Sequence, residues 1–209
     1  MKVYSIFKSL QGEGLTMGAP TTFVRTSGCP LRCAYCDTKQ AYDKGEEMSL
    51  DQVMKKVAKH KTRHVCLTGG EPLLQKDALK LIQMLVDKGY HVVLETNGAM
   101  PLDDMPCVEN LTLSMDIKCP SSGESSKMLF NNIEVLGPTD QLKFIISDDA
   151  DYEYAKQVIG EYCPKCEVIM TPVGGKDLRS LAEKVLKDGL EVRVLPQLHK
   201  FIWGDEDDR

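Results

Sequence analysis

The sequence predicts an α/β protein that forms an incomplete barrel of six strand–helix units, a (βα)6-type partial TIM barrel. Short runs of β-branched and apolar residues alternate with amphipathic stretches, a pattern typical of parallel strands joined by helices. The chain has 209 residues, fewer than the roughly 250 of a complete eight-fold barrel. Polar motifs follow several of the expected strands, at the end where barrel proteins place their reactive groups.

The first half of the chain supplies three strands and two helices. Ser49 is a favourable N-cap for the first helix, and Gly89 ends the second because glycine readily adopts the conformation that follows a helix. We expect strands over 22–25, 65–68 and 91–96 and helices over 50–60 and 77–88.

The second half continues the alternation. We expect strands over 111–115, 141–146 and 167–170, helices over 152–162 and 176–187, and a final edge strand over 191–195. Gly189 ends the last of these helices. A barrel with about six units stays open on one side, and an open side admits a larger substrate than a closed barrel does.

Composition narrows the class of protein. A hydrophobic fraction of 42% in a chain of this length predicts one globular domain over 1–209. The net charge of −5 disfavours a nucleic-acid-binding surface, and we expect the acidic tail 204–209 to be solvated. No apolar stretch approaches the length of a membrane span, and the first residues have no signal-peptide core. Eight cysteines without such a signal predict a reducing, cytoplasmic location.

Three cysteines are the most informative feature. Cys29, Cys33 and Cys36 lie in a loop directly after the first expected strand. Three thiolates at this spacing can bind three irons of a [4Fe–4S] cluster and leave the fourth iron open to a small molecule with amino and carboxylate groups. The loop therefore predicts radical chemistry that starts from S-adenosylmethionine, and Tyr35 is suited to lie against its adenine.

Two other interpretations of the cysteines were weighed. Structural zinc takes four ligands, and the nearest histidines, His60 and His64, lie beyond an expected helix. A disulfide framework requires an oxidising compartment. The remaining cysteines that could form a second metal site are interpreted as free thiols instead: Cys107, Cys119, Cys163 and Cys166.

Further polar motifs follow the later strands. In the segment 68–72 the paired glycines let the backbone approach a ligand closely, and Glu71 can accept a hydrogen bond from an ammonium group. Ser114, Asp116 and Lys118 occupy alternate positions and should face one side of an extended segment. A tight turn and a solvated strand end explain these motifs equally well in isolation, but beside the cysteine loop they favour a binding site.

Four other residues are candidates for substrate or metal binding. Gln11 and Glu13 can read the donor and acceptor edge of a flat heterocycle, and Arg25 can pair with a carboxylate. The Thr38 hydroxyl is a hard oxygen ligand suited to Mg²⁺. A surface loop, an internal salt bridge and a turn cap are the alternatives that the spacing leaves open.

Together these motifs resemble the 7-carboxy-7-deazaguanine synthase family, and the resemblance extends over nearly the whole chain. The cysteine and Gly-Gly-Glu-Pro motifs are shared by many radical SAM enzymes, whereas Gln-Gly-Glu-Gly and Cys-Asp-Thr single out this family. The resemblance rests on the segments 10–14, 23–25, 28–38, 68–72, 95–98 and 197–200. It implies a partial barrel of the radical SAM kind.

The resemblance also implies a reaction. A lyase of this family converts 6-carboxy-5,6,7,8-tetrahydropterin to 7-carboxy-7-deazaguanine, a precursor of queuosine and related deazapurines of the tRNA modification pathway. The 5′-deoxyadenosyl radical formed from S-adenosylmethionine takes a hydrogen from C6, the ring contracts with loss of ammonia, and Mg²⁺ assists. The resemblance further implies a flavodoxin- or ferredoxin-type electron donor and a homodimer, with no direct contact to nucleic acid or membrane.

Site residues follow position by position from the motifs and the resemblance. The expected metal ligands are Cys29, Cys33 and Cys36 for the cluster and Thr38 for Mg²⁺. The expected S-adenosylmethionine contacts are Tyr35, Cys36, Asp37, Gly70, Glu71, Ser114, Asp116 and Lys118. The expected substrate contacts are Leu10, Gln11, Gly12, Glu13, Arg25, Thr68 and His199, and residues 1–20 are expected to form a short N-terminal substrate segment. The family's Ser-Pro-Lys is replaced here by a longer spacing between Ser114 and Lys118.

Two competing functions were considered. A small radical SAM activase, which makes a glycyl radical on a partner protein, shares the cysteine triad, but the Gln-Gly-Glu-Gly segment and Arg25 disfavour it. An iron–sulfur electron carrier needs neither the Gly-Gly-Glu-Pro motif nor the other polar strand ends, and it does not bind S-adenosylmethionine.

Overall fold

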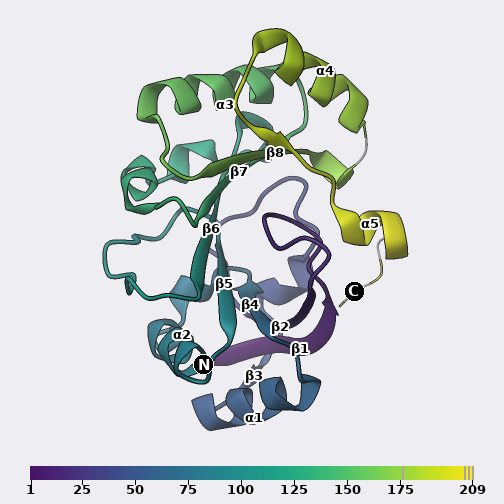
Figure 1. Cartoon of the computed structure of the whole chain (residues 1–209). Coiled ribbons are helices and arrows are strands. Elements are labelled where there is room, and N and C mark those ends of the chain that lie inside the picture. The colour runs from purple at the N-terminus through teal and green to yellow at the C-terminus, as the bar shows by residue number, and fades with distance from the viewer. Residues whose placement is uncertain (176, 205, 207, 209) are drawn as a thin grey trace.

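The computed structural model describes residues 1–175, 177–204, 206 and 208, and these form a single curved sheet with helices packed on it (Figure 1). The sheet has nine strands in the order β3-β1-β2-β4-β5-β6-β7-β8-β9. Its strands are β1 (Lys2–Leu10), β2 (Pro20–Thr26), β3 (Glu46–Glu47), β4 (His64–Gly69), β5 (His91–Thr96), β6 (Leu111–Ile117), β7 (Gln141–Ile146), β8 (Glu167–Pro172) and β9 (Arg193–Val194). Its α-helices are α1 (Leu50–His60), α2 (Ala78–Asp87), α3 (Asp149–Tyr162), α4 (Leu178–Asp188) and α5 (Leu198–Trp203).

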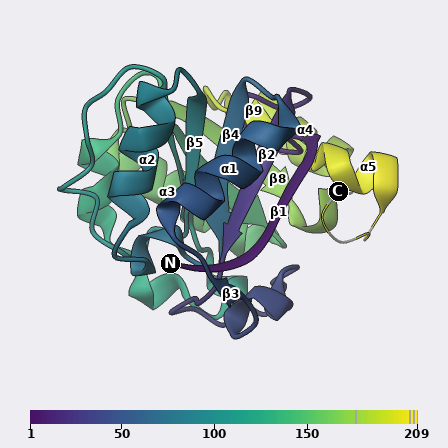
Figure 2. The same cartoon turned by 90° about the horizontal axis from the view of Figure 1, so that it is seen from below.

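The strands from β2 onward form a parallel sheet that does not close. Each is parallel to its neighbour from β2 to β9, whereas β1 is antiparallel to both β2 and β3. β3 and β9 lie at the two ends of the strand order, so the sheet keeps two edges. Helix α1 packs against β1 and β2, α2 against β5, α3 against β7 and α4 against β8 and β9 (Figure 2). The expected partial barrel is confirmed.

Most of the expected elements occur where the sequence places them. The strands over 91–96 and 141–146 match β5 and β7, and the final edge strand is present as the short β9. Ser49 caps α1 reciprocally with Gln52: each side chain accepts a hydrogen bond from the other residue's backbone N–H. The expected start of the helix over 176–187 falls at residue 176, outside the described residues, and α4 begins at Leu178.

Some elements and boundaries differ from expectation. The strands β1 and β3 and the short helix α5 were not predicted from the sequence, and α3 begins at Asp149. Residues 2–10 of the expected substrate segment 1–20 therefore belong to the sheet, and residues 11–19 form the loop between β1 and β2. Strand β6 continues to Ile117, so Asp116 lies within a strand and not after it.

The core fixes the relative positions of the strands. Leu67 of β4, Leu94 of β5 and Phe144 of β7 are fully buried, as are Leu81 and Leu85 on the inner face of α2. Burying one such side chain contributes about 1.5–3 kcal/mol, so the sheet is a rigid support for the polar groups that it carries. No helix in the described part of the chain has the length and apolar character needed to cross a membrane.

Candidate active site

The register of the sheet brings polar side chains of successive strands into one row. Arg25 is paired with Thr68, Glu95 with Ser114, and Ser114 with Gln141. Neighbouring residues of parallel strands point to the same face, so these side chains share one side of the sheet. Within the row, Thr68 Oγ1 donates to Glu95 at 2.8 Å and Gln141 Nε2 donates to Ser114 Oγ at 2.7 Å.

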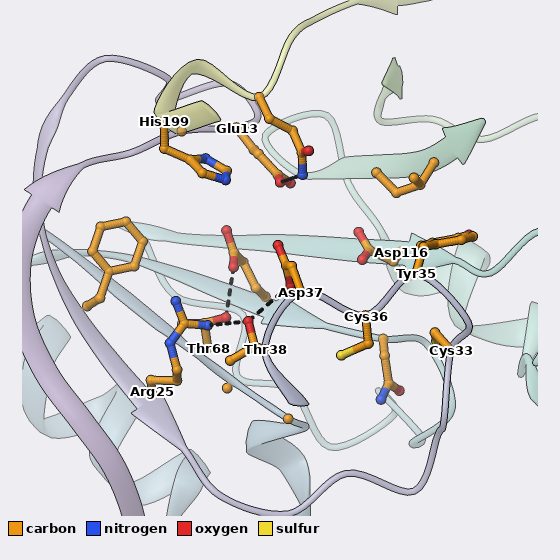
Figure 3. A pocket seen from close by; sticks show the side chains of 18 of the residues that line it. Glu13, Arg25, Cys33, Tyr35, Cys36, Asp37, Thr38, Thr68, Asp116 and His199 are labelled. Atoms are coloured by element: carbon orange, nitrogen blue, oxygen red, sulfur yellow. Dashed lines mark hydrogen bonds between the residues drawn. The ribbon is translucent and has the colours of Figure 1, made fainter. Parts of the chain in front are cut away.

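This side of the sheet borders a cavity of about 360 Å³, a size suited to a small ligand (Figure 3). The cysteine side chains lie on one side of the cavity and Arg25 on another, with Glu13 and His199 facing them. The cavity brings together most of the residues predicted from the sequence: Leu10, Gln11, Gly12, Glu13, Arg25, Cys29, Cys33, Tyr35, Cys36, Asp37, Thr38, Thr68, Gly70, Asp116, Lys118 and His199.

Glu71 does not face the cavity, contrary to the expectation that it accepts from an ammonium group of a ligand. Its side chain is fully buried, and its carboxylate accepts from the backbone N–H groups of Leu73 at 3.0 Å and Asn97 at 2.8 Å and from Thr96 Oγ1 at 3.0 Å. Burial raises the pKa of Glu71, and these hydrogen bonds oppose the rise. Glu71 therefore ties the end of β5 to the turn after β4.

Ser114 is also fully buried and does not line the cavity, because its hydroxyl is occupied by Gln141. The next two members of the alternating motif do face the cavity. Lys118 Nζ lies 2.7 Å from Asp116 Oδ2. Burial raises the pKa of Asp116, but attraction to Lys118 and then Lys143 outweighs this and sets it at about 2. Asp116 is therefore an anion at neutral pH.

The cysteine loop is held against the turn after β4. The Gly28 carbonyl accepts from the Glu71 backbone N–H at 2.7 Å. A Cβ atom added at Gly70 would lie 2.1 Å from that carbonyl oxygen and 2.9 Å from Cys29 Cβ, so a glycine is required at this contact. Asn97 Nδ2 donates to Cys29 Sγ at 3.5 Å and orients the first thiol.

The three thiols fit an iron–sulfur cluster better than zinc. Cys29, Cys33 and Cys36 are free, partly buried and exposed to the same cavity. Among the described residues, no three His, Cys, Asp or Glu side chains are gathered closely enough to bind one metal ion. A cluster gives each thiolate its own iron, so its ligands need not converge on one point. Burial raises the pKa values of the Cys29 and Cys33 thiols, which a bound metal deprotonates outright.

The four cysteines considered for a second metal site do not line the cavity. Cys107 and Cys163 are exposed, Cys119 is buried and Cys166 is partly buried, and none of the four is in a disulfide. Their interpretation as free thiols stays a prediction.

The loop after β1 closes the cavity from the side of the last strands. Gln11 Nε2 donates to Glu95 at 3.2 Å. Glu13 accepts from Gln197 Nε2 at 2.7 Å, and the Gly12 carbonyl accepts from the Leu198 backbone N–H at 2.8 Å. Helix α5 thereby carries His199 onto Gly12, where a Cβ atom would lie 2.1 Å from His199 Nδ1. His199 therefore lines the cavity beside Gly12, and its role there stays a prediction.

Arg25 lies between the cysteine loop and the C-terminal tail. Its Nη1 donates to Thr38 Oγ1 at 3.3 Å, and Thr38 Oγ1 donates to Asp37 at 3.0 Å (Figure 3). Arg25 Nε lies 3.9 Å from Asp208 Oδ1, which also accepts from Ser5 Oγ at 3.0 Å. Within the tail that was expected to be solvated, Asp208 is therefore paired with the Arg25 cation while 36% of its side chain stays exposed.

The cavity residues that were not assigned a role from the sequence include three with strongly polar side chains: Glu95, Lys143 and Gln197. Glu95 and Gln197 lie in segments that carry the family resemblance, but nothing in their spacing gives them partners. Lys143 could have been recognised in the sequence, because it interrupts the apolar run of β7. A lysine inside a buried parallel strand has to find an anionic partner.

Comparison with known proteins agrees with this site. The family model "Radical SAM superfamily" matches residues 23–115. A 7-carboxy-7-deazaguanine synthase of Methanospirillum hungatei is 44% identical over 203 residues, covering 97% of this chain and 85% of the relative. The protein of the same name from Thermoplasma acidophilum is 39% identical over 98% of both chains.

Solved structures share the fold. The crystal structure of QueE from Escherichia coli superposes with a TM-score of 0.78 at 23% identity and covers 95% of this chain and 94% of its own. Streptococcus suis SuiB bound to S-adenosylmethionine superposes with a TM-score of 0.60 at 10% identity, over 81% of this chain and 48% of SuiB.

Proposed function

The chain belongs to the 7-carboxy-7-deazaguanine synthase family, and on this premise we propose a substrate and assign roles to the residues of its cavity. It is a radical SAM enzyme of deazapurine biosynthesis, with a [4Fe–4S] cluster and S-adenosylmethionine as cofactors. We propose that it converts 6-carboxy-5,6,7,8-tetrahydropterin to 7-carboxy-7-deazaguanine, with ring contraction and loss of ammonia, on the route to queuosine. The whole chain acts as one radical SAM domain, as its continuous sheet supports.

The observation that carries this proposal is the division of one cavity into three parts. Cysteines lie on one side, a guanidinium on another, and a carboxylate opposite both. A flat heterocycle that bears a carboxylate at one end and N–H donors at the other matches the last two parts. The cysteine side serves the cofactors.

Cys29, Cys33 and Cys36 hold the cluster in this proposal. Gly70 leaves room for the close contact between the turn after β4 and the cysteine loop, and Asn97 orients Cys29. The cluster and S-adenosylmethionine supply, when bound, the radical chemistry that removes one hydrogen atom of the substrate and returns it.

The cofactor's methionine and adenine groups contact residues beside the cluster. Tyr35 and Asp37 belong to the cysteine loop, and Asp116 and Lys118 lie at the end of β6. Asp116 stays anionic because of its lysine neighbours, which suits it to an ammonium or hydroxyl donor of the cofactor.

Arg25 binds the substrate carboxylate. Its guanidinium already has an anionic neighbour in Asp208, which supports its selectivity for carboxylates. At the other end Gln11 and Glu13 read the edge of the ring, with Thr68 beside them and His199 closing the cavity.

Thr38 is the proposed ligand for Mg²⁺. Its hydroxyl faces the cavity between Arg25 and Asp37, so oxygen ligands from the substrate carboxylate could complete the coordination there. The cation would offset the negative charge that the substrate brings.

Two partners complete the proposal. A flavodoxin- or ferredoxin-type protein supplies the electron that the cluster requires. The enzyme acts as a homodimer, supported by the exposed apolar side chains of Phe201 and Ile202 on α5. Its net charge of −5 suits a free pterin and not tRNA as the substrate.

The test is anaerobic turnover. The reconstituted protein receives dithionite, S-adenosylmethionine, Mg²⁺ and 6-carboxytetrahydropterin, and the products are identified by mass spectrometry. A 7-carboxy-7-deazaguanine product supports the proposal. Cleavage of S-adenosylmethionine without that product would refute the substrate and favour the activase function.

A further inference from the structure

A buried lysine lies between two carboxylates on the wall of the cavity. Lys143 lies in the middle of β7, and its side chain is only 6% exposed. Its Nζ is 2.9 Å from Glu13 Oε2 and 3.2 Å from Asp116 Oδ1. The pairing with Asp116 follows from the sheet register, in which the two residues are direct neighbours on β6 and β7.

The two carboxylates depend on Lys143 to different degrees. Asp116 also contacts Lys118, at 2.7 Å. Among the described residues, Lys143 is the cation in ion-pair contact with Glu13. Removing the Lys143 charge would therefore leave Asp116 paired but would take from Glu13 the ion pair that the described residues provide.

Glu13 retains capacity to bind a ligand. An ionised carboxylate offers about four lone-pair positions, and Gln197 and Lys143 each occupy one of them. The Glu13 side chain is 20% exposed, and it faces the cavity (Figure 3). Two adjacent N–H donors on the edge of a heterocycle match the two positions that remain.

We propose that Lys143 is a positioning residue for the substrate: it keeps Glu13 ionised and oriented so that this carboxylate accepts both N–H donors of the aminopyrimidinone edge of the pterin. The inference rests on the proposed function, from which the pterin is taken. Lys143 itself needs no contact with the substrate.

The charges around Glu13 support this role. Burial raises the pKa of Glu13, attraction to Lys143 lowers it, repulsion from Asp116 raises it, and the net result lies below the ordinary value. Without Lys143 the burial and the repulsion from Asp116 remain. Gln197 is neutral, Lys118 is engaged by Asp116, and Glu95 adds further negative charge near Lys143. Glu13 would then bind a proton in mildly acidic solution. Its new O–H would face an N–H of the ligand, and two donors cannot form a hydrogen bond with each other.

The experiment measures binding and not turnover. Cluster-loaded protein with S-adenosylmethionine is dialysed to equilibrium against 6-carboxypterin, an oxidised analogue whose fluorescence reports the free concentration. The titration is repeated between about pH 5 and pH 7, above the ordinary pKa of glutamate. The variants are Lys143→Met, Glu13→Gln, their double mutant and Lys156→Met. Lys156 on α3 is the matched control because it pairs with Asp188 at the end of α4, away from the cavity.

We expect Lys143→Met to weaken the binding of 6-carboxypterin at least about tenfold at pH 5, because loss of a hydrogen bond to a charged group has an effect of this size. The affinity of this variant should recover as the pH rises. The wild type and Lys156→Met should show the same weak pH dependence, set by the ligand's own carboxylate. An unchanged affinity with an unchanged pH profile in Lys143→Met would overturn the inference.

If Lys143→Met folds poorly, the double mutant still provides a decisive test, because the double mutant removes an anion and a cation together. If Lys143 acts through Glu13, then adding Lys143→Met to Glu13→Gln should cause no further loss of affinity. A further loss would overturn the inference. Failure of the wild type to bind 6-carboxypterin would instead overturn the proposed substrate, and with it the role of Lys143.

Discussion

Replacing Gly70 by alanine should displace the cysteine loop. The added Cβ would lie 2.1 Å from the Gly28 carbonyl oxygen, whereas real Cβ contacts are essentially never shorter than 3.0 Å. The neighbour is backbone and cannot rotate away, so the two segments have to separate by about 1 Å. The same carbonyl accepts from the Glu71 backbone N–H at 2.7 Å, and a shift of this size would break that hydrogen bond.

The cost follows from these two effects. Overpacking contributes about 1–3 kcal/mol, and a lost hydrogen bond between buried groups about 1 kcal/mol more. A total of about 2–4 kcal/mol lowers the melting temperature of a domain of this size by about 5–15 °C. Because Cys29 Cβ would also lie too close, at 2.9 Å, the first cluster ligand moves as well. We expect iron and sulfide incorporation to fall clearly below the wild-type level.

The assay is anaerobic reconstitution, followed by measurement of iron, sulfide and cluster absorbance together with thermal unfolding. Gly160→Ala is the matched control, because a Cβ at that position in α3 meets no atom within 4 Å. This control should be slightly stabilised, by up to about 1 kcal/mol, since alanine favours a helix. Wild-type iron content and melting temperature in Gly70→Ala would refute the close-contact argument.

Three further predictions concern the cavity. Cys33→Ala should abolish cluster assembly and cleavage of S-adenosylmethionine, measured by iron content and chromatography, while Cys107→Ala, which removes an exposed thiol, should retain both. Arg25→Ala should weaken binding of 6-carboxypterin by about tenfold or more in equilibrium dialysis without changing the cluster spectrum. The control is Arg179→Ala on the surface. An unchanged affinity in Arg25→Ala would contradict the role of Arg25. Asp208→Asn should tighten binding of 6-carboxypterin by up to about fivefold, because it removes a partly exposed anion that competes with the ligand for Arg25. The substitution should not change the affinity for a pterin that has no carboxylate. Equal changes for both ligands would argue against competition.

Helix and strand positions were well predicted where the pattern is local. The capping box of α1 involves residues three apart, and the buried runs of β5 and β7 are bounded by turn residues. β1 was missed because polar and apolar residues do not alternate along it and Val3 is its one buried residue; its place in the sheet depends on pairing with β2, which follows the loop 11–19, and with β3 further on. α5 was missed because six residues carry too short a pattern.

The candidate site could be predicted only as a set of motifs. Glu71 and Ser114 stand in the same motifs as cavity residues, yet both are fully buried and bonded to neighbouring strands and turns. Their spacing could not show this, since burial depends on which chain segments pack above them. Asp208 was assigned to a solvated tail because the attraction to Arg25 spans most of the chain.

The sequence by itself determined the alternation of strands and helices, the cysteine loop and the family motifs, because each depends on residues that are close neighbours in the chain. Only the tertiary structure decided which polar groups share a row, that Lys143 lies between Glu13 and Asp116, and that α5 carries His199 onto Gly12. The physical reason is the register of the parallel sheet and the path of its loops. These bring into contact charges that are distant in the chain, such as Glu13 and Lys143, which are 130 positions apart, and electrostatic attraction acts through space and not along the chain.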